Sequence, residues 1–182
     1  MRKITTLMLI ITVFLFSFSL AESTRFGYAP MLATNYVKWA DEFRVADISM
    51  DYYYSSDTDE NNEKTLFVDD IAIVYDNSTL YANYAALFYM SKNSDALAMV
   101  DQWKRASSFY CCLQYGDPLQ SGVDIAKAKQ EADSFITDLN NTMRDSYDDL
   151  RNGRPILFFT GKNADFYISY IIDEGQWMIF AQ

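Results

Sequence analysis

Two long helical patterns in the middle of the chain, with strand patterns on both sides of them, constrain the fold most. Apolar residues recur every three or four positions over 97–113 and again over 125–150. Gly116 and Pro118 lie between the two patterns and indicate a stop followed by a short turn. Amphipathic helices joined in this way pack against each other in opposite directions. We therefore expect an antiparallel pair of long helices.

The segments before this pair indicate one short helix and three strands. Pro30, followed by apolar residues at spacings of three and four, predicts a helix over 31–43. Alternating residues over 45–55 and a second run over 65–75 predict two strands. Residues 79–91 fit a helix as well as a strand, and we favour a strand because the aromatic residues outweigh the alanines.

The segment after the helix pair indicates a β-meander, which completes an α+β fold. Its three strands are expected over 156–160, 166–172 and 177–181. Runs of strands separated by helices are typical of an antiparallel sheet with helices on one face. We predict a single α+β domain over 22–182, with an antiparallel sheet of β-meanders packed against the pair of long helices.

The first 21 residues have the layout of a secretory signal peptide. Arg2 and Lys3 precede an uncharged stretch, 4–19, and Ser19 and Ala21 place small residues where a signal peptidase reads. The apolar stretch of about 16 residues is shorter than the ~20 that span a bilayer. We expect cleavage after Ala21 and an extracytoplasmic protein, in the periplasm, at the cell surface or secreted, with no remaining membrane span.

Composition argues against several classes of function. Without the two basic residues of the leader, 13 basic residues stand against 25 acidic ones, a net charge of about −12. Such a surface repels phosphate backbones, so nucleic acid is not an expected partner. The chain of 182 residues has no histidine, which excludes His-based triads, proton shuttles and imidazole zinc sites. We expect no cofactor, and we favour a binding protein over an enzyme.

Tyr52, Tyr53 and Tyr54 are the candidate binding residues. Consecutive strand residues point to opposite faces of a sheet, so we expect at least one ring to be exposed. Exposed aromatic rings with an acidic rim suit recognition of a protein, a peptide or a component of the cell envelope. The other interpretation is an aromatic-rich sheet whose second face is covered by the helices. The leading hypothesis is an exported, acidic binding module.

Asp70 is the candidate catalytic residue of an alternative function. Asp69 and Asp70 interrupt an apolar run, and a buried carboxyl with a raised pKa is a candidate general acid. This gives a carboxylate-dependent extracytoplasmic hydrolase as the alternative, for which the sequence does not place a second carboxylate. A bend that exposes both residues is the favoured interpretation.

Cys111 and Cys112 are the only cysteines, and they give a second alternative. Adjacent residues close no useful loop, so buried free thiols are the favoured interpretation. The other two interpretations are pairing with another chain and a strained vicinal disulfide, which would act as a redox switch. The chain would then be a redox-sensitive structural protein.

Asp57, Asp59 and Asn61 begin a calcium-loop pattern, in which oxygen ligands at alternate positions surround one cation. The pattern then breaks, because Asn62 stands where glycine is needed and Val68 where a bidentate Glu is needed. We favour a solvated acidic loop and expect no metal.

Overall fold

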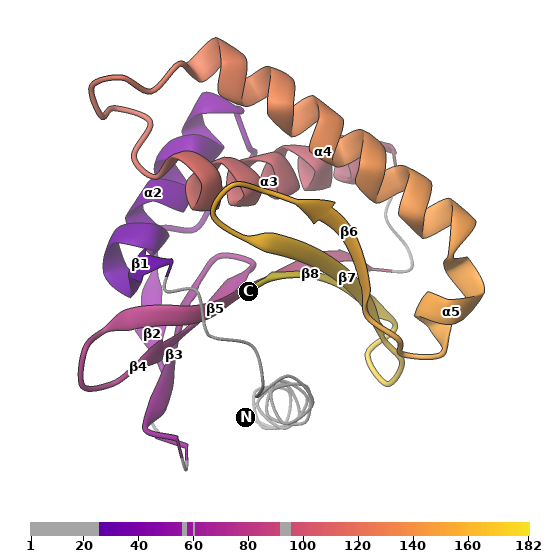
Figure 1. The fold of residues 1–182 in the computed structure, drawn as a ribbon, viewed down its shortest axis with the longest axis horizontal. Helices are drawn as coiled ribbons and strands as arrows, with labels where there is room; N and C mark the ends of the chain where they lie inside the picture. Colours follow the sequence, from indigo (N-terminus) through magenta and orange to yellow (C-terminus); the bar gives the residue numbers. More distant parts are fainter. Residues whose placement is uncertain (1–25, 56–57, 60, 92–95) are drawn as a thin grey trace.

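The computed structural model describes residues 26–55, 58–59, 61–91 and 96–182, and it has an antiparallel sheet with helices on one face (Figure 1). The leader expected over 1–21 lies outside the described residues. The strands are β1 (Gly27–Tyr28), β2 (Tyr52–Tyr54), β3 (Glu63–Val68), β4 (Ile71–Asp76), β5 (Tyr81–Ser91), β6 (Ile156–Thr160), β7 (Asp165–Ile171) and β8 (Gln176–Ala181). The helices are α2 (Ala29–Glu42), α3 (Ala96–Tyr115), α4 (Ile125–Asp145) and α5 (Tyr147–Arg151). The predicted α+β class with an antiparallel sheet is confirmed.

Two meanders share this sheet. The strand order is β2-β3-β4-β5-β8-β7-β6, and β1 pairs with β5 outside this path. The first meander ends with β5 and the second ends with β8, and these two central strands pair antiparallel, with Ala86 opposite Phe180. The helices α3, α4 and α5 form the connection between the two meanders. None of the helices in the described part of the chain is long and apolar enough to cross a membrane.

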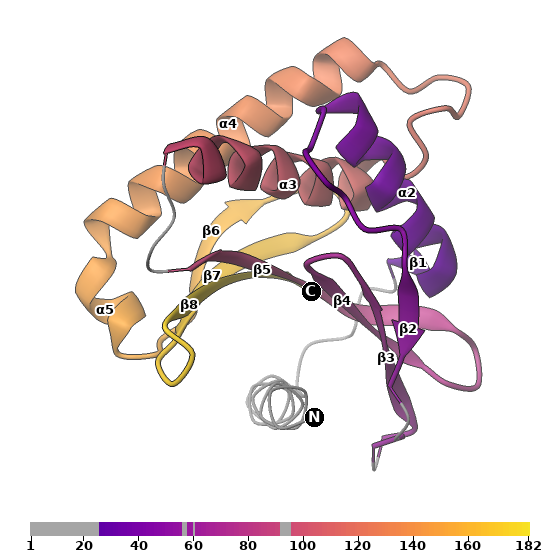
Figure 2. The ribbon, with the colours of Figure 1, turned by 180° about the vertical axis from the view of Figure 1, so that it is seen from behind.

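The helices all lie on one face of the sheet, and the sheet bends away from them (Figures 1 and 2). Helices α3 and α4 have 20 and 21 residues, run in opposite directions and pack on each other. The predicted second helix is too long, because α4 ends at Asp145 and the short helix α5 follows Ser146. The main core lies between the helices and the sheet, where Trp39, Phe109, Phe135 and Phe166 are buried.

The strand predicted over 45–55 is wrong in its first part, since only Tyr52–Tyr54 pairs with a neighbour. Arg44 and Asp47 have positive φ angles of 55° and 48°, which turn the chain away from the sheet. The carbonyl groups of Arg44 and Ala46 accept hydrogen bonds from Lys104 (2.8 Å) and Arg105 (3.0 Å) of α3. Backbone groups need partners, and here a helix provides them in place of a strand.

The single strand predicted over 65–75 is also wrong, because two strands, β3 and β4, form a tight hairpin there. Val68 and Ile71 face each other across the hairpin, and Asp69 and Asp70 form its two-residue turn. Asp69 has a φ of 50°, in the left-handed region that Asp tolerates better than most residues. In contrast, the strand favoured for 79–91 is confirmed as β5.

Candidate functional site

The sheet has a second apolar cluster on the face that points away from the helices, which we call the helix-free face. Alternation along β3, β4, β5, β7 and β8 places every second side chain there. No helix or strand within the described ranges lies over this face (Figure 2). Because the sheet bends away from the helices, the helix-free face is its concave side. The cluster contains Phe67, Ala72, Val74, Tyr84, Ala86, Ile171, Met178 and Phe180, with Phe88 and Tyr167 packed against it.

Aromatic rings of neighbouring strands stack across this face. Phe180 of β8 stacks with Tyr84 of β5 and with Tyr167 of β7, with ring centroids 5.6 Å and 5.2 Å apart. At the β2 side of the sheet, the Tyr53 ring stacks on Phe67 with centroids 4.8 Å apart. Stacked rings provide a large, rigid contact area that loses little conformational entropy on binding.

Of the three candidate tyrosines, the structure places only Tyr53 on the helix-free face. Tyr53 is half exposed. The ring of Tyr54 meets Tyr75, whose side chain belongs to the main core on the helix side. Tyr52 shares the face of Tyr54, because side chains two apart in a strand point the same way. The aromatic triplet is therefore divided between the two faces.

Carboxylates lie at the ends of the strands that form the helix-free face. Glu63 and Asp76 are paired at one end of the β3–β4 hairpin, and Asp165 begins β7. Burial, together with Asp59 and Asp76, raises the pKa of Glu63, while its hydrogen bond from Asn83 opposes this shift. The face thus has an apolar centre and an acidic border.

Sequence analysis missed this face as a whole, although a signal for it exists. The run Ile71 to Tyr75 in β4 is apolar at every position, which is typical of a strand covered on both faces. The helices of the described chain cover one face only. A strand apolar on both sides in such a fold indicates a second apolar surface, on the face opposite the helices.

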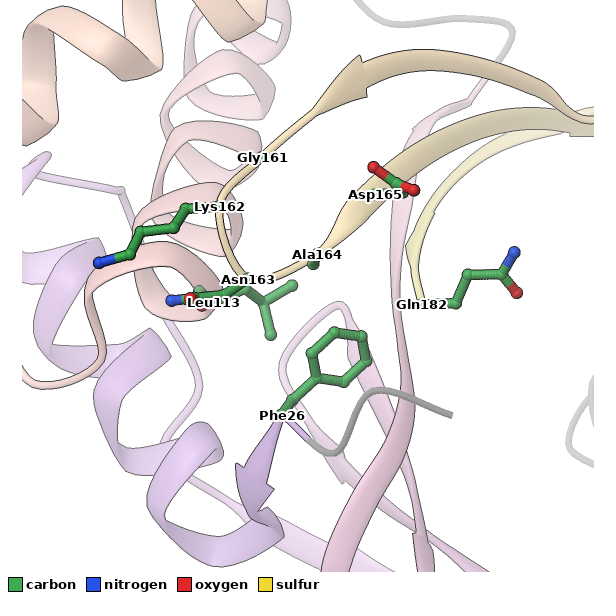
Figure 3. A pocket seen from close by; sticks show the side chains of 8 residues that line it. All are labelled: Phe26, Leu113, Gly161, Lys162, Asn163, Ala164, Asp165 and Gln182. Carbon is green, nitrogen blue, oxygen red and sulfur yellow. Dashed lines mark hydrogen bonds between the residues drawn. The ribbon is translucent and has the colours of Figure 1, made fainter. Parts of the chain in front are cut away.

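A hollow of about 460 Å³ lies at the start of β7 and the end of β8, between Phe26, Leu113, Gln182 and the 161–164 turn (Figure 3). The side chains of its two charged residues, Lys162 and Asp165, do not point toward one another. The turn is fixed by Gln114 of α3, whose side-chain oxygen accepts hydrogen bonds from the backbone N–H groups of Lys162 (2.6 Å) and Asn163 (3.1 Å). Hydrogen bonds to Gln114 therefore hold the turn that lines this hollow, and the two charged side chains of the lining do not converge as a catalytic pair would.

We expect Gly161→Ala to destabilise the fold by about 1–3 kcal/mol, the usual range for overpacking. A Cβ atom at this position would lie 2.5 Å from Nε2 of Gln114 and 2.7 Å from its Cδ. Gln114 cannot withdraw without losing its two bonds to the turn. Chemical denaturation of this variant measures the change, and the same replacement in a Gln114→Ala background is the control, since the atoms that the new Cβ would meet belong to the Gln114 side chain. An equal cost of Gly161→Ala in both backgrounds would contradict the steric explanation.

Asp70 lies in the turn of the β3–β4 hairpin, where its carboxylate contacts a buried arginine that sequence analysis did not identify. Arg105 of α3 binds Asp101 through Nε (2.9 Å) and Asp70 through Nη1 (3.2 Å), and its Nη1 also contacts Asp69. Burial and the neighbouring Asp101 raise the pKa of Asp70. Asp69 also accepts a hydrogen bond from the backbone of Ser49. The three carboxylates converge on a guanidinium, and none of them lines the hollow beside Gly161.

The two cysteines are free and buried, and they point to different helices. The Cys112 thiol donates to the carbonyl group of Leu32 in α2 (3.2 Å), and the Cys111 thiol donates to that of Ala128 in α4 (3.6 Å). Burial raises the pKa of both thiols, which disfavours the reactive thiolate. The redox alternative remains a prediction that this geometry does not support.

The calcium-loop candidates are only partly described, because Asp57 lies outside the described residues. Asp59 directs Oδ1 at the backbone N–H groups of Asn61 (2.9 Å) and Glu63 (2.7 Å), as in a hydrogen-bonded turn. Within the ranges that the structure covers, no cluster of three or more acidic or cysteine side chains is arranged to hold a metal.

Comparison with protein-family models, with curated proteins and with solved structures finds no match to this chain. The candidate site is therefore defined by its own geometry. That geometry is a concave, aromatic sheet face with an acidic border.

Proposed function

We propose that this chain is an exported binding module whose helix-free face takes an apolar segment of a polypeptide. The observation that carries the proposal is the apolar cluster on the concave side of the sheet, with no described element over it. Burial of apolar area is the main favourable term in association, at about 25 cal/mol per Å². The members of the cluster are almost fully buried, so the apolar area that a ligand can cover on this face is that of the half-exposed Tyr53 and the partly exposed Phe88 and Tyr167.

Curvature and charge indicate what kind of segment fits. A helix is about 10 Å in diameter and suits the concave side of a bent sheet better than a flat surface does. Carboxylates at the strand ends, such as Glu63 and Asp165, favour Lys or Arg next to the apolar stretch. A net charge of about −12 for the predicted mature chain acts in the same direction. The preferred ligand is an apolar helical segment flanked by basic residues.

The proposal is tested by the binding of a labelled synthetic peptide of two lysines followed by sixteen Leu and Ala residues. Fluorescence anisotropy measures its affinity for the chain 22–182. We expect Tyr53→Ala to weaken binding about 5- to 30-fold, equivalent to ~1–2 kcal/mol for an exposed aromatic anchor. Loss of the Tyr53 ring removes its contact area and its stack on Phe67.

Tyr52→Ala is the matched control for this experiment. Both tyrosines are exposed residues of β2, but Tyr52 points to the other face of the sheet. Tyr52→Ala should leave the affinity of the peptide unchanged, and the affinity of the unmodified chain should fall with added salt. Equal affinities for the unmodified chain and Tyr53→Ala would mean that the peptide does not bind to the helix-free face.

A further inference from the structure

We infer that three aromatic rings beside α5 form a binding site for a quaternary ammonium group, in which Arg151 of the same chain serves as a tethered cation. The rings belong to Tyr147, Tyr170 and Trp177, and we call them the aromatic cage. Tyr170 and Trp177 pack on the core at the helix side of the sheet. The cage therefore shares no residue with the helix-free face, and it does not depend on the function proposed above.

Three elements bring the rings of the cage together. Tyr147 begins α5, which packs on β7, and Tyr170 and Trp177 are paired residues of β7 and β8 (Figure 1). The Trp177 ring centroid lies 4.8 Å from that of Tyr170 and 6.3 Å from that of Tyr147, with interplanar angles of 57° and 45°. Trp177 is 9% exposed, whereas Tyr147 is 47% exposed. The indole is therefore the floor of the cage, and Tyr147 is a wall that solvent reaches.

The position of Arg151 shows that the rings accept a cation. Its Cζ atom lies 5.7 Å from the ring centroid of Tyr147 and 5.7 Å from that of Tyr170. Both distances are within the ~6 Å at which the face of an aromatic ring attracts a positive charge. Asp148, the second residue of α5, also interacts electrostatically with Arg151. Rings and carboxylate together favour a positive charge at this place.

The polar groups of the cage favour a cation that has no N–H group. Nη1 of Arg151 donates to the hydroxyl group of Tyr147 (3.2 Å), but ring faces are weak acceptors for the other N–H groups of a guanidinium. A quaternary ammonium group needs no acceptor, and its methyl groups contact aromatic rings directly. Arg151 is exposed, so its guanidinium regains water when it leaves the rings. A quaternary ammonium ligand therefore takes the place of Arg151.

Titration with choline tests the site on the protein purified after expression of the full chain. The chain has three tryptophans, Trp39, Trp103 and Trp177, and each indole N–H group gives its own signal in a proton–nitrogen NMR spectrum. We expect choline to shift the Trp177 signal until it saturates and to leave the other two unchanged, with Trp177→Phe identifying the signal. Equal shifts of all three signals, or none, would overturn the inference.

The uncharged analogue of choline, in which carbon replaces the nitrogen atom, is the control ligand. It has the same shape but no charge, so we expect it to bind at least about 5-fold more weakly. Equal affinity for choline and this alcohol would mean that the rings form an ordinary apolar patch and not a cation site.

Two variants test the roles of the tethered arginine and the outer wall. Arg151→Gln removes the competing cation, so choline should bind about 3- to 10-fold more tightly. Tyr147→Leu removes a wall and should weaken binding by a similar factor, with circular dichroism verifying the fold. Arg154→Gln is the matched control, because Arg154 contacts Asp149 (3.7 Å) and should not affect the affinity. Weaker binding by Arg151→Gln, or unchanged binding by Tyr147→Leu, would contradict the cage.

Vesicles distinguish two sources of the same chemical group. Co-sedimentation with phosphatidylcholine vesicles but not with phosphatidylglycerol vesicles, lost in Tyr147→Leu, would assign the cage to a lipid headgroup. Choline binding without co-sedimentation would assign it to a small free molecule. A protein that binds neither choline nor phosphatidylcholine would refute the site.

Discussion

Replacement of Arg105 by methionine lowers the free energy of unfolding by about 3–5 kcal/mol, the expected cost of removing one partner of a buried ion pair. The side chain of Arg105 is 9% exposed, and its guanidinium contacts Asp69, whose side chain is 10% exposed. Methionine fills a similar volume but leaves the Asp69 carboxylate buried without its counter-charge. Urea denaturation at pH 7, followed by circular dichroism, measures the effect.

Arg144→Met is the matched control for this variant. Arg144 pairs with Asp145 at 2.8 Å, but both side chains are largely exposed, and such pairs contribute about 0–1 kcal/mol. A similar, small loss for both variants would mean that the Arg105 cluster is solvated in solution. If Arg105→Met lowers the free energy of unfolding much more than Arg144→Met does, burial of the Arg105 ion pairs accounts for the difference.

The Arg105 cluster also explains why part of the fold escapes sequence analysis. Arg105 donates to the carbonyl group of Ala46, and Asp101 accepts from the N–H group of the same residue (2.8 Å). These partners are more than fifty positions apart in the sequence. Alternation over 45–51 resembles a strand, but side chains of α3 satisfy the backbone and no neighbouring strand does. Local patterns do not report such distant partners.

The elements that sequence analysis predicts correctly are those whose periodicity continues over many residues. Helix α4 keeps an apolar residue at every third or fourth position, and β5 is long enough for aromatic residues to decide between strand and helix. The Asp69–Asp70 turn has only two residues, which are too few to show a periodic pattern. Two adjacent acidic residues inside an apolar run fit a bend, a bulge and a hairpin equally well.

The candidate site was predictable in part for the same reason. Alternation shows that the rings of Tyr52 and Tyr53 point to opposite faces, but not which face lacks a helix. That distinction depends on where α3 and α4 pack, which is a property of the whole fold. Tyr53 was therefore a candidate from sequence, whereas Phe180 and Tyr84 become candidates only through the sheet order.

Phe135→Ala is the second variant with a large expected effect, a loss of about 3–5 kcal/mol in the free energy of unfolding. Phe135 of α4 is fully buried, and its ring centroid lies 4.8 Å from that of Tyr110 and 5.0 Å from those of Phe158 and Phe166. It joins α4 to α3 and to two strands. Truncation leaves a cavity among rings that are held by other contacts and do not collapse to fill it.

Tyr53→Ala provides the contrast, because its ring is half exposed and lies on the other face of the sheet. We expect this change to cost under about 1 kcal/mol of stability, measured by the same urea denaturation. If Phe135→Ala cost as little, α4 would not pack on the sheet as the structure has it. A large cost for Phe135→Ala and a small one for Tyr53→Ala would mean that the Phe135 ring on the helix side stabilises the fold, while the Tyr53 ring on the helix-free side serves binding. Mature Phe135→Ala chain that is still folded should therefore bind the Lys-Leu-Ala peptide normally, whereas fully stable Tyr53→Ala chain should not.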